Sequence, residues 1–154
     1  MNPYEDLGRW IDAHHPEQIA FLREIVRVPS DTPPGDNAAA AEKAATLLAA
    51  MNFGVERHPV PEDFLRAYSM RSVTNLIVRQ RFGSGGPTIA LNAHGDVVPP
   101  GEGWTRPPYA GEIENGRMYG RGVAVSKSDI ATYTYALAAL RALAKNNGAV
   151  LNGT

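Results

Sequence analysis

The fold is decided by residues 88–99, which read Thr88-Ile89-Ala90-Leu91-Asn92-Ala93-His94-Gly95-Asp96-Val97-Val98-Pro99. Apolar side chains alternate with other residues in the first half, so Ile89, Leu91 and Ala93 fall on one face of a predicted strand. His94 follows at the carboxyl end of that strand, before a loop rich in proline and glycine. Active sites of open α/β sheets gather at the carboxyl ends of strands, which favours a functional role for His94.

The segments on either side of this stretch predict helices and strands that together form an α/β layer structure. Helices are expected from about Pro16 towards Pro29, from Asp36 or Asn37 to a terminator at Gly54, and from about Ser126 to Lys145. Strands are expected at residues 55–60, 75–79 and 88–93, with a hairpin turn at Asn115-Gly116. Residues 30–35 are expected to form a loop, and residues 61–74 are expected to be irregular.

A last strand could open at residues 149–151. This order of elements leaves the edge of the predicted sheet unpaired, which predicts a chain that aggregates or depends on a partner.

Composition places the chain among ordinary globular domains and excludes several functions. It has 154 residues, 44% of them apolar and 20% charged, with a net charge of −1 and no cysteine. This size suits one domain, and no internal boundary is visible. Basic residues form no stripe for nucleic acid and no patch for a membrane. Any metal would be held by His, Asp or Glu. No signal peptide is visible, so cytoplasmic is the default expectation.

The first candidate for chemistry is the pair His94 and Asp96. Residues two apart at a strand end project to the same side, so the two side chains could converge on one site. A histidine that binds a metal usually needs a carboxylate to fix its tautomer, and Asp96 could serve. The alternative is a polar junction between strand and loop, in which Asp96 binds the amides of a turn.

The second candidate is residues 119–129. Two glycines around Arg121, directly before a helix, predict a close backbone approach near a helix amino terminus, where anions are favoured. Ser126 and Asp129 have the spacing of a capping box, which favours a capping role for Asp129 over a role as a metal ligand.

Other features favour no function. His14, His15 and His58 have no partner at ligand spacing and are expected to be surface residues. Residues 83–86 lack the lysine and helix of a phosphate-binding loop, and no Gly-x-Ser-x-Gly elbow occurs. A nucleotide-binding module and a serine hydrolase are therefore not supported.

The motifs become specific when they are taken in order: His94-x-Asp96-Val97-Val98-Pro99-x-Gly101, Trp104, Pro107-Pro108-Tyr109, Gly116, Tyr119-Gly120-Arg121-Gly122 and Lys127. This set resembles the first half of the signature of a zinc metallopeptidase and amidohydrolase family. The family includes aminoacylases, acetylornithine deacetylases, succinyl-diaminopimelate desuccinylases, dipeptidases and carboxypeptidase G-type enzymes. Residues 28–30 and 74–76 resemble its opening helix end and its first central strand.

The resemblance implies the amino-terminal portion of a di-zinc exopeptidase-like three-layer α/β fold, with a mixed, mostly parallel sheet left incomplete. Residues 1–154 would be the amino-terminal part of the catalytic, metal-binding domain, without its second half and without the lid or dimerisation domain. Complete relatives are implied to be homodimers.

The implied activity is that of a metallopeptidase or deacylase, namely metal-dependent hydrolysis of amide bonds in N-acyl amino acids or short peptides. The metal would be zinc, two ions per complete site, with cobalt as an alternative. By resemblance His94 is a zinc ligand, and Asp96, counted with the catalytic residues, supports it.

One departure from the family pattern lies inside the motif. Val125 stands where the resemblance implies an aspartate that bridges two zinc ions, and a valine has no lone pair to donate. Three readings stay open: Asp129 supplies the carboxylate from one helical turn away, roughly 6 Å along the axis; the protein uses a single metal; or the chain is a non-catalytic remnant or pseudoenzyme. In each case the chain alone is expected to be inactive, since a catalytic zinc normally needs three protein ligands.

Overall fold

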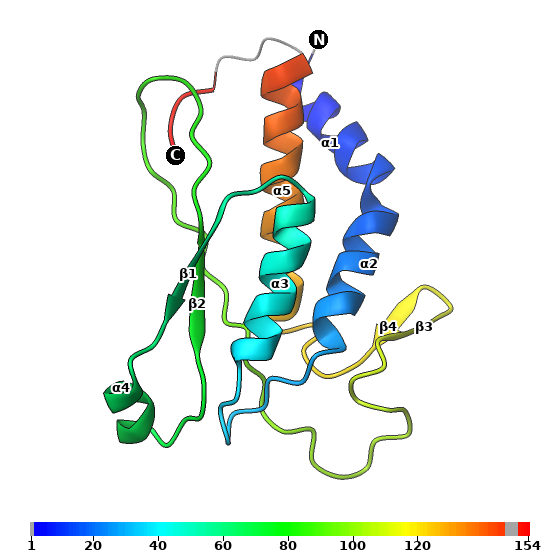
Figure 1. Cartoon of the computed structure of the whole chain (residues 1–154). Coiled ribbons are helices and arrows are strands. Elements are labelled where there is room, and N and C mark those ends of the chain that lie inside the picture. The colour runs from blue at the N-terminus through cyan, green and yellow to red at the C-terminus, as the bar shows by residue number, and fades with distance from the viewer. Residues whose placement is uncertain (1, 147–150) are drawn as a thin grey trace.

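The molecule is a layer of helices with a two-stranded ribbon on one side and a short hairpin on the other (Figure 1). The structure is a computed structural model that describes residues 2–146 and 151–154. The central helices are α2 (His15–Val26), α3 (Ala38–Ala50) and α5 (Lys127–Asn146), and α1 (Pro3–Ala13) precedes α2 and also packs on α5.

The strands form two separate antiparallel pairs. β1 (Val55–Pro59) pairs with β2 (Thr74–Val78) next to α3, and the short helix α4 (Glu62–Ala67) lies in the connection between them. β3 (Glu112–Glu114) pairs with β4 (Arg117–Tyr119) on the other side of the helices (Figure 1).

The core lies between α2, α3 and α5. Phe21 of α2 meets Tyr135 of α5 edge to face, with ring centroids 6.0 Å apart, an arrangement that aromatic pairs favour. The other buried apolar residues of this cluster are Leu22, Ile25, Val26, Ala44, Leu48, Phe53 and Ala131. Except for Phe53, which follows α3, these residues recur at spacings of three or four along their helices. This spacing explains why these segments are helical and which face they bury.

Most predicted elements are confirmed. The three predicted helices correspond to α2, α3 and α5, and the strands at 55–60 and 75–79 correspond to β1 and β2. The hairpin turn is also confirmed: Asn115 and Gly116 have φ angles of 50° and 74°, as a type I′ turn requires.

Three local predictions need correction. No helix was predicted before Pro16, yet Asn2 caps α1 by accepting a hydrogen bond from the Tyr4 backbone N–H at 3.1 Å. Residues 61–74 contain α4 and are not wholly irregular. Gly54 does not end α3. Asn52 takes the left-handed conformation there, with φ at 60°, which asparagine tolerates because its short polar side chain can hydrogen-bond locally.

The predicted strand at residues 88–93 is wrong for the part of the chain that the structure describes. These residues lie outside any strand, and Ile89 and Leu91 are 71% and 57% exposed. A strand needs neighbours to satisfy its backbone groups, and no described strand pairs with this segment.

The mostly parallel sheet is likewise not seen within residues 2–146 and 151–154. Parallel pairing there is limited to two isolated bridges, Asp31 with Val97 and Asp36 with Ser72. In the strand predicted at 149–151, residues 149 and 150 lie outside the described residues, and Leu151 is not in a strand. None of the described helices is long and apolar enough to cross a membrane.

Candidate functional site

His94 and Asp96 face each other, as their spacing predicted. The Nδ1 atom of His94 lies 3.0 Å from the backbone carbonyl oxygen of Asp96 and 3.2 Å from its carboxylate oxygen Oδ1. Both partners accept hydrogen bonds, so Nδ1 carries the hydrogen of the neutral ring and Nε2 keeps its lone pair. This is the arrangement in which a histidine offers Nε2 to a metal.

The loop that carries this pair is bound to the segment that follows α2. The Val97 N–H donates to the Ser30 carbonyl at 2.9 Å, and the Thr32 N–H donates to the Val97 carbonyl at 2.8 Å. The Ser30 hydroxyl, fully buried, donates to the Gly95 carbonyl at 2.7 Å. Hydrogen bonds therefore hold the backbone on both sides of Asp96.

The Gly-Arg-Gly motif packs against the same loop. The Arg121 guanidinium donates to the carbonyls of Val98 and, at 3.0 Å, of Pro99. Gly122 has φ at 87°, and a Cβ atom there would lie 2.9 Å from Val97. A Cβ atom on Gly120 would lie 2.9 Å from Val26. The predicted close backbone approach is confirmed, because a side chain on either glycine would collide with a neighbour.

Lys127 is the first residue of α5 and is only 2% exposed. Its Nζ donates to the carbonyls of Ile25 and Val28, at 3.0 and 2.8 Å, at the carboxyl end of α2. Burial lowers the pKa of Lys127 to about 8, while the charge of Asp31 acts in the opposite direction. The ammonium is therefore still mostly protonated at pH 7, and it interacts favourably with the negative end of the α2 dipole.

Asp31 also binds the loop that precedes β3. The Tyr109 hydroxyl donates a hydrogen bond to the Asp31 carboxylate. Burial, followed by this contact with Asp31, raises the pKa of Tyr109 well above its ordinary value of 10.0. Tyr109 therefore remains a neutral donor at all physiological pH values.

The two remaining candidate residues, Val125 and Asp129, lie at the start of α5. The Ser126 hydroxyl donates to the Asp129 carboxylate at 2.9 Å, and the Asp129 N–H donates to the Ser126 carbonyl at 2.9 Å. Asp129 thus contacts Ser126, the residue directly before α5, but through its side chain, and not through the side-chain-to-backbone bonds of the predicted capping box. Val125 is 66% exposed and presents hydrocarbon to solvent.

The described residues do not fit a complete metal site. Residues 2–146 and 151–154 contain no group of three or more His, Asp or Glu side chains that could hold an ion. His94 with Asp96 offers one ligand, whereas a catalytic zinc normally takes three from the protein. His15 and His58 are exposed, as expected of surface histidines, and His58 contacts Glu56. His14 is instead half-buried and stacks on Trp10.

Lys127 is part of the sequence motif, but neither its role nor that of Ser30 was predicted. The position of Lys127 in the sequence did indicate a role for its charge. A lysine in the first turn of a helix opposes the helix dipole, so its presence indicates that its charge is used elsewhere. The roles of Ser30 and of the contact between Asp31 and Tyr109 depend on pairing across the chain, which no local pattern reveals.

Comparison with known proteins gives this arrangement a class. Residues 90–151, which include both motifs, match the family described as Peptidase family M20/M25/M40. The chain belongs to this peptidase family, in agreement with the resemblance in the sequence.

The individual relatives are more specific. The succinyl-diaminopimelate desuccinylase of Rhodospirillum centenum is 36% identical over 135 residues, which cover 86% of this chain and 32% of the relative. The protein of the same name from Methylobacterium sp. (strain 4-46) is 41% identical over 118 residues, 75% of this chain and 28% of the relative. The chain therefore spans about a third of the length of the curated relatives it matches.

Proposed function

We propose that this chain supplies His94 and Asp96 to the active site of a zinc-dependent hydrolase that cleaves amide bonds in N-acyl amino acids or short peptides. The observation that supports this most directly is the contact of His94 Nδ1 with Asp96, which leaves Nε2 available as a ligand. In this proposal His94 binds the metal and Asp96 fixes the tautomer and orientation of the imidazole.

The described residues provide one ligand, so the remaining ligands belong to parts of the protein outside this chain. Residues 1–154 are then the amino-terminal part of the catalytic domain. Zinc, when bound, supplies Lewis-acid activation of water and of the carbonyl. A cytoplasmic homodimer is part of the same proposal.

A second candidate function is favoured by Val125. Its exposed hydrocarbon side chain stands where the resemblance implies a carboxylate shared by two metal ions. Two close divalent cations without a shared carboxylate lack neutralising charge. In this alternative the chain is a remnant that keeps the fold and has lost hydrolysis.

The experiment that separates the two uses the chain alone and the chain fused to the remaining part of the Methylobacterium relative, each with Val125 and with Val125→Asp. Zinc content is measured by elemental analysis, and hydrolysis is measured with succinyl-diaminopimelate and an N-acetyl amino acid. We expect no turnover by the chain alone, and zinc-dependent turnover by the fusion that is abolished by His94→Ala.

Turnover only in the fusion with Val125→Asp would support the remnant. Failure of both fusions to bind zinc, although folded, would contradict the assignment of His94 to a metal site. Zinc-dependent turnover by the chain alone would show that another set of ligands operates.

A further inference from the structure

We propose that Lys127 and Ser30 are positioning residues that act in series to hold the loop bearing His94 and Asp96. This inference rests on the proposed function for its catalytic meaning, but its geometry stands on contacts that involve no metal. Neither side chain contacts His94, so neither is assigned a chemical step.

The first step in the series joins two helix ends. Lys127, at the start of α5, donates to the carbonyls of Ile25 and Val28 at the end of α2. The last carbonyls of a helix have no partner within the helix, and a buried carbonyl without a partner is costly. Lys127 satisfies one of them, that of Ile25, and also the carbonyl of Val28 two residues beyond the helix. It thereby fixes the point from which the chain leaves α2 towards Ser30.

The second step joins that exit to the loop. Ser30 lies two residues beyond Val28, is fully buried, and binds the loop through its hydroxyl at Gly95 and through its backbone carbonyl at Val97. The two contacts bracket Asp96, whose own carbonyl and carboxylate contact His94. A shift of Ser30 would therefore move the acceptors that orient the imidazole.

A merely structural role predicts a different result from a positioning role. If Lys127 and Ser30 only stabilise the molecule, their loss weakens all regions alike. If they position the loop, the amides of Thr32 and Val97 and the tautomer of His94 respond more than the core. Both quantities can be measured by NMR on the 154-residue chain itself.

The test uses Ser30→Ala, which removes one hydroxyl, with Thr134→Val as matched control. Thr134 is also buried, and its hydroxyl donates to the Ile130 carbonyl within α5 at 2.7 Å. We expect Ser30→Ala to speed hydrogen exchange at Thr32 and Val97 about five- to tenfold more than at Leu48, the effect of losing one hydrogen bond. The Thr134→Val variant should show no such selectivity.

The second readout is the nitrogen spectrum of the His94 ring, recorded at a pH where the imidazole is neutral. The two acceptors beside Nδ1 favour the tautomer with hydrogen on Nδ1, and we expect Ser30→Ala and Lys127→Met each to reduce the population of this tautomer. If Lys127→Met does not fold, Ser30→Ala carries the test. Equal acceleration at Thr32, Val97 and Leu48, or an unchanged tautomer in Ser30→Ala, would overturn the proposal.

This outcome is independent of the metal experiment. A selective effect in the chain combined with absence of zinc in the fusions would refute the proposed function and leave the positioning geometry in place. Zinc-dependent turnover by the fusions, combined with equal acceleration of hydrogen exchange at all sites in the chain, would support the proposed function and refute the positioning role.

Discussion

Four glycines in the site and the neighbouring hairpin differ in why a side chain would be unfavourable. The two possible reasons are a positive φ angle and a lack of space for a Cβ atom. Gly122 has both a positive φ and a crowded Cβ position, Gly120 has crowding only, Gly116 has a positive φ only, and Gly95 has neither. A positive φ costs a side-chain-bearing residue about 1–2 kcal/mol, and overpacking typically costs about 1–3 kcal/mol.

Substitution of each glycine by alanine should therefore give a graded series of unfolding free energies. Gly122→Ala should be the most destabilising, because both costs apply. Gly120→Ala and Gly116→Ala should each lose about 1 kcal/mol or more, and Gly95→Ala should change little. Urea denaturation of the four variants measures this order, and equal effects at Gly122 and Gly95 would contradict the close packing of the Gly-Arg-Gly motif.

At the scale of elements, the contact between α2 and α3 includes a charged group. Glu24 of α2 binds Lys43 of α3 and, at 3.0 Å, Arg27, the residue that follows α2. The hydrogen bond from Lys43, with a further one from Arg27, lowers the pKa of Glu24 below its ordinary value of 4.5, against the opposite effect of burial. The charged carboxylate is thus bound more favourably in the folded state than in the unfolded chain.

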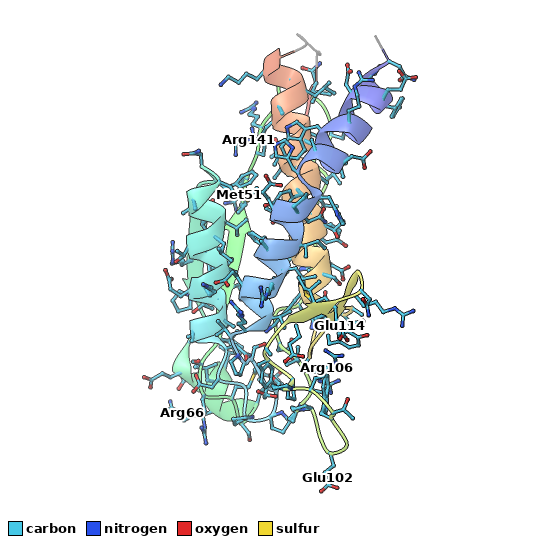
Figure 2. All side chains as sticks on the ribbon, turned by 90° about the vertical axis from the view of Figure 1, so that its right-hand side faces the viewer. Met51, Arg66, Glu102, Arg106, Glu114 and Arg141 are labelled. Carbon is cyan, nitrogen blue, oxygen red and sulfur yellow. The ribbon has the colours of Figure 1, made fainter. Side chains whose placement is uncertain are left out.

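This shift predicts a specific dependence of stability on pH. A carboxylate whose pKa is depressed on folding stabilises the protein above its unfolded value and loses that contribution as pH falls below about 4.5. The difference in unfolding free energy between the parent chain and Glu24→Gln should therefore shrink below that pH. The control is Glu102→Gln, at the tip of the exposed loop (Figure 2), for which the difference should stay near zero throughout.

The elements were predictable where the signal is local. Asn115-Gly116 predicts its turn, because few residue pairs adopt two successive positive φ angles. The apolar residues that recur at helical spacing predict α2 and α5. α4 could not be predicted, since six residues carry too little periodicity. Residues 88–93 alternate as a strand should, but alternation supplies no hydrogen-bond partner, and pairing is a property of the neighbouring chain.

At the scale of the whole molecule, residues 88–93 leave apolar side chains in water. Ile89 and Leu91 alternate on an extended segment and are largely exposed, which is typical of a surface that other chains can pair with.

Replacing both residues by threonine should reduce self-association, as measured by sedimentation, and should reduce binding of a dye that reports apolar surface. The thermal midpoint should change little, because the side chains contribute little burial. Ile113→Thr is the control, since Ile113 is half exposed but lies in a paired strand. Unchanged association in the double variant would contradict the sequence-based expectation of an aggregation-prone edge.

The candidate site was predictable only where its residues are close together in the sequence. His94, Asp96 and the two glycines of the motif are adjacent enough for spacing to suggest their roles. Ser30 and Lys127 are not, because their partners are chosen by the fold. Figure 2 shows a similar case on the surface, where Arg106 and Glu114 come together from the loop and from β3.

The bonds of Lys127 and Ser30 also fix the order in which this region can form. Ser30 and Gly95 are 65 positions apart, and Lys127 and Ile25 are 102 positions apart. Such long loops have a large closure entropy, and contacts of this kind form late in folding. During synthesis, the Ile25 carbonyl can bind only water in place of Lys127 until residue 127 has left the ribosome. The nascent chain therefore carries His94 for some time before all the contacts that hold its loop can form.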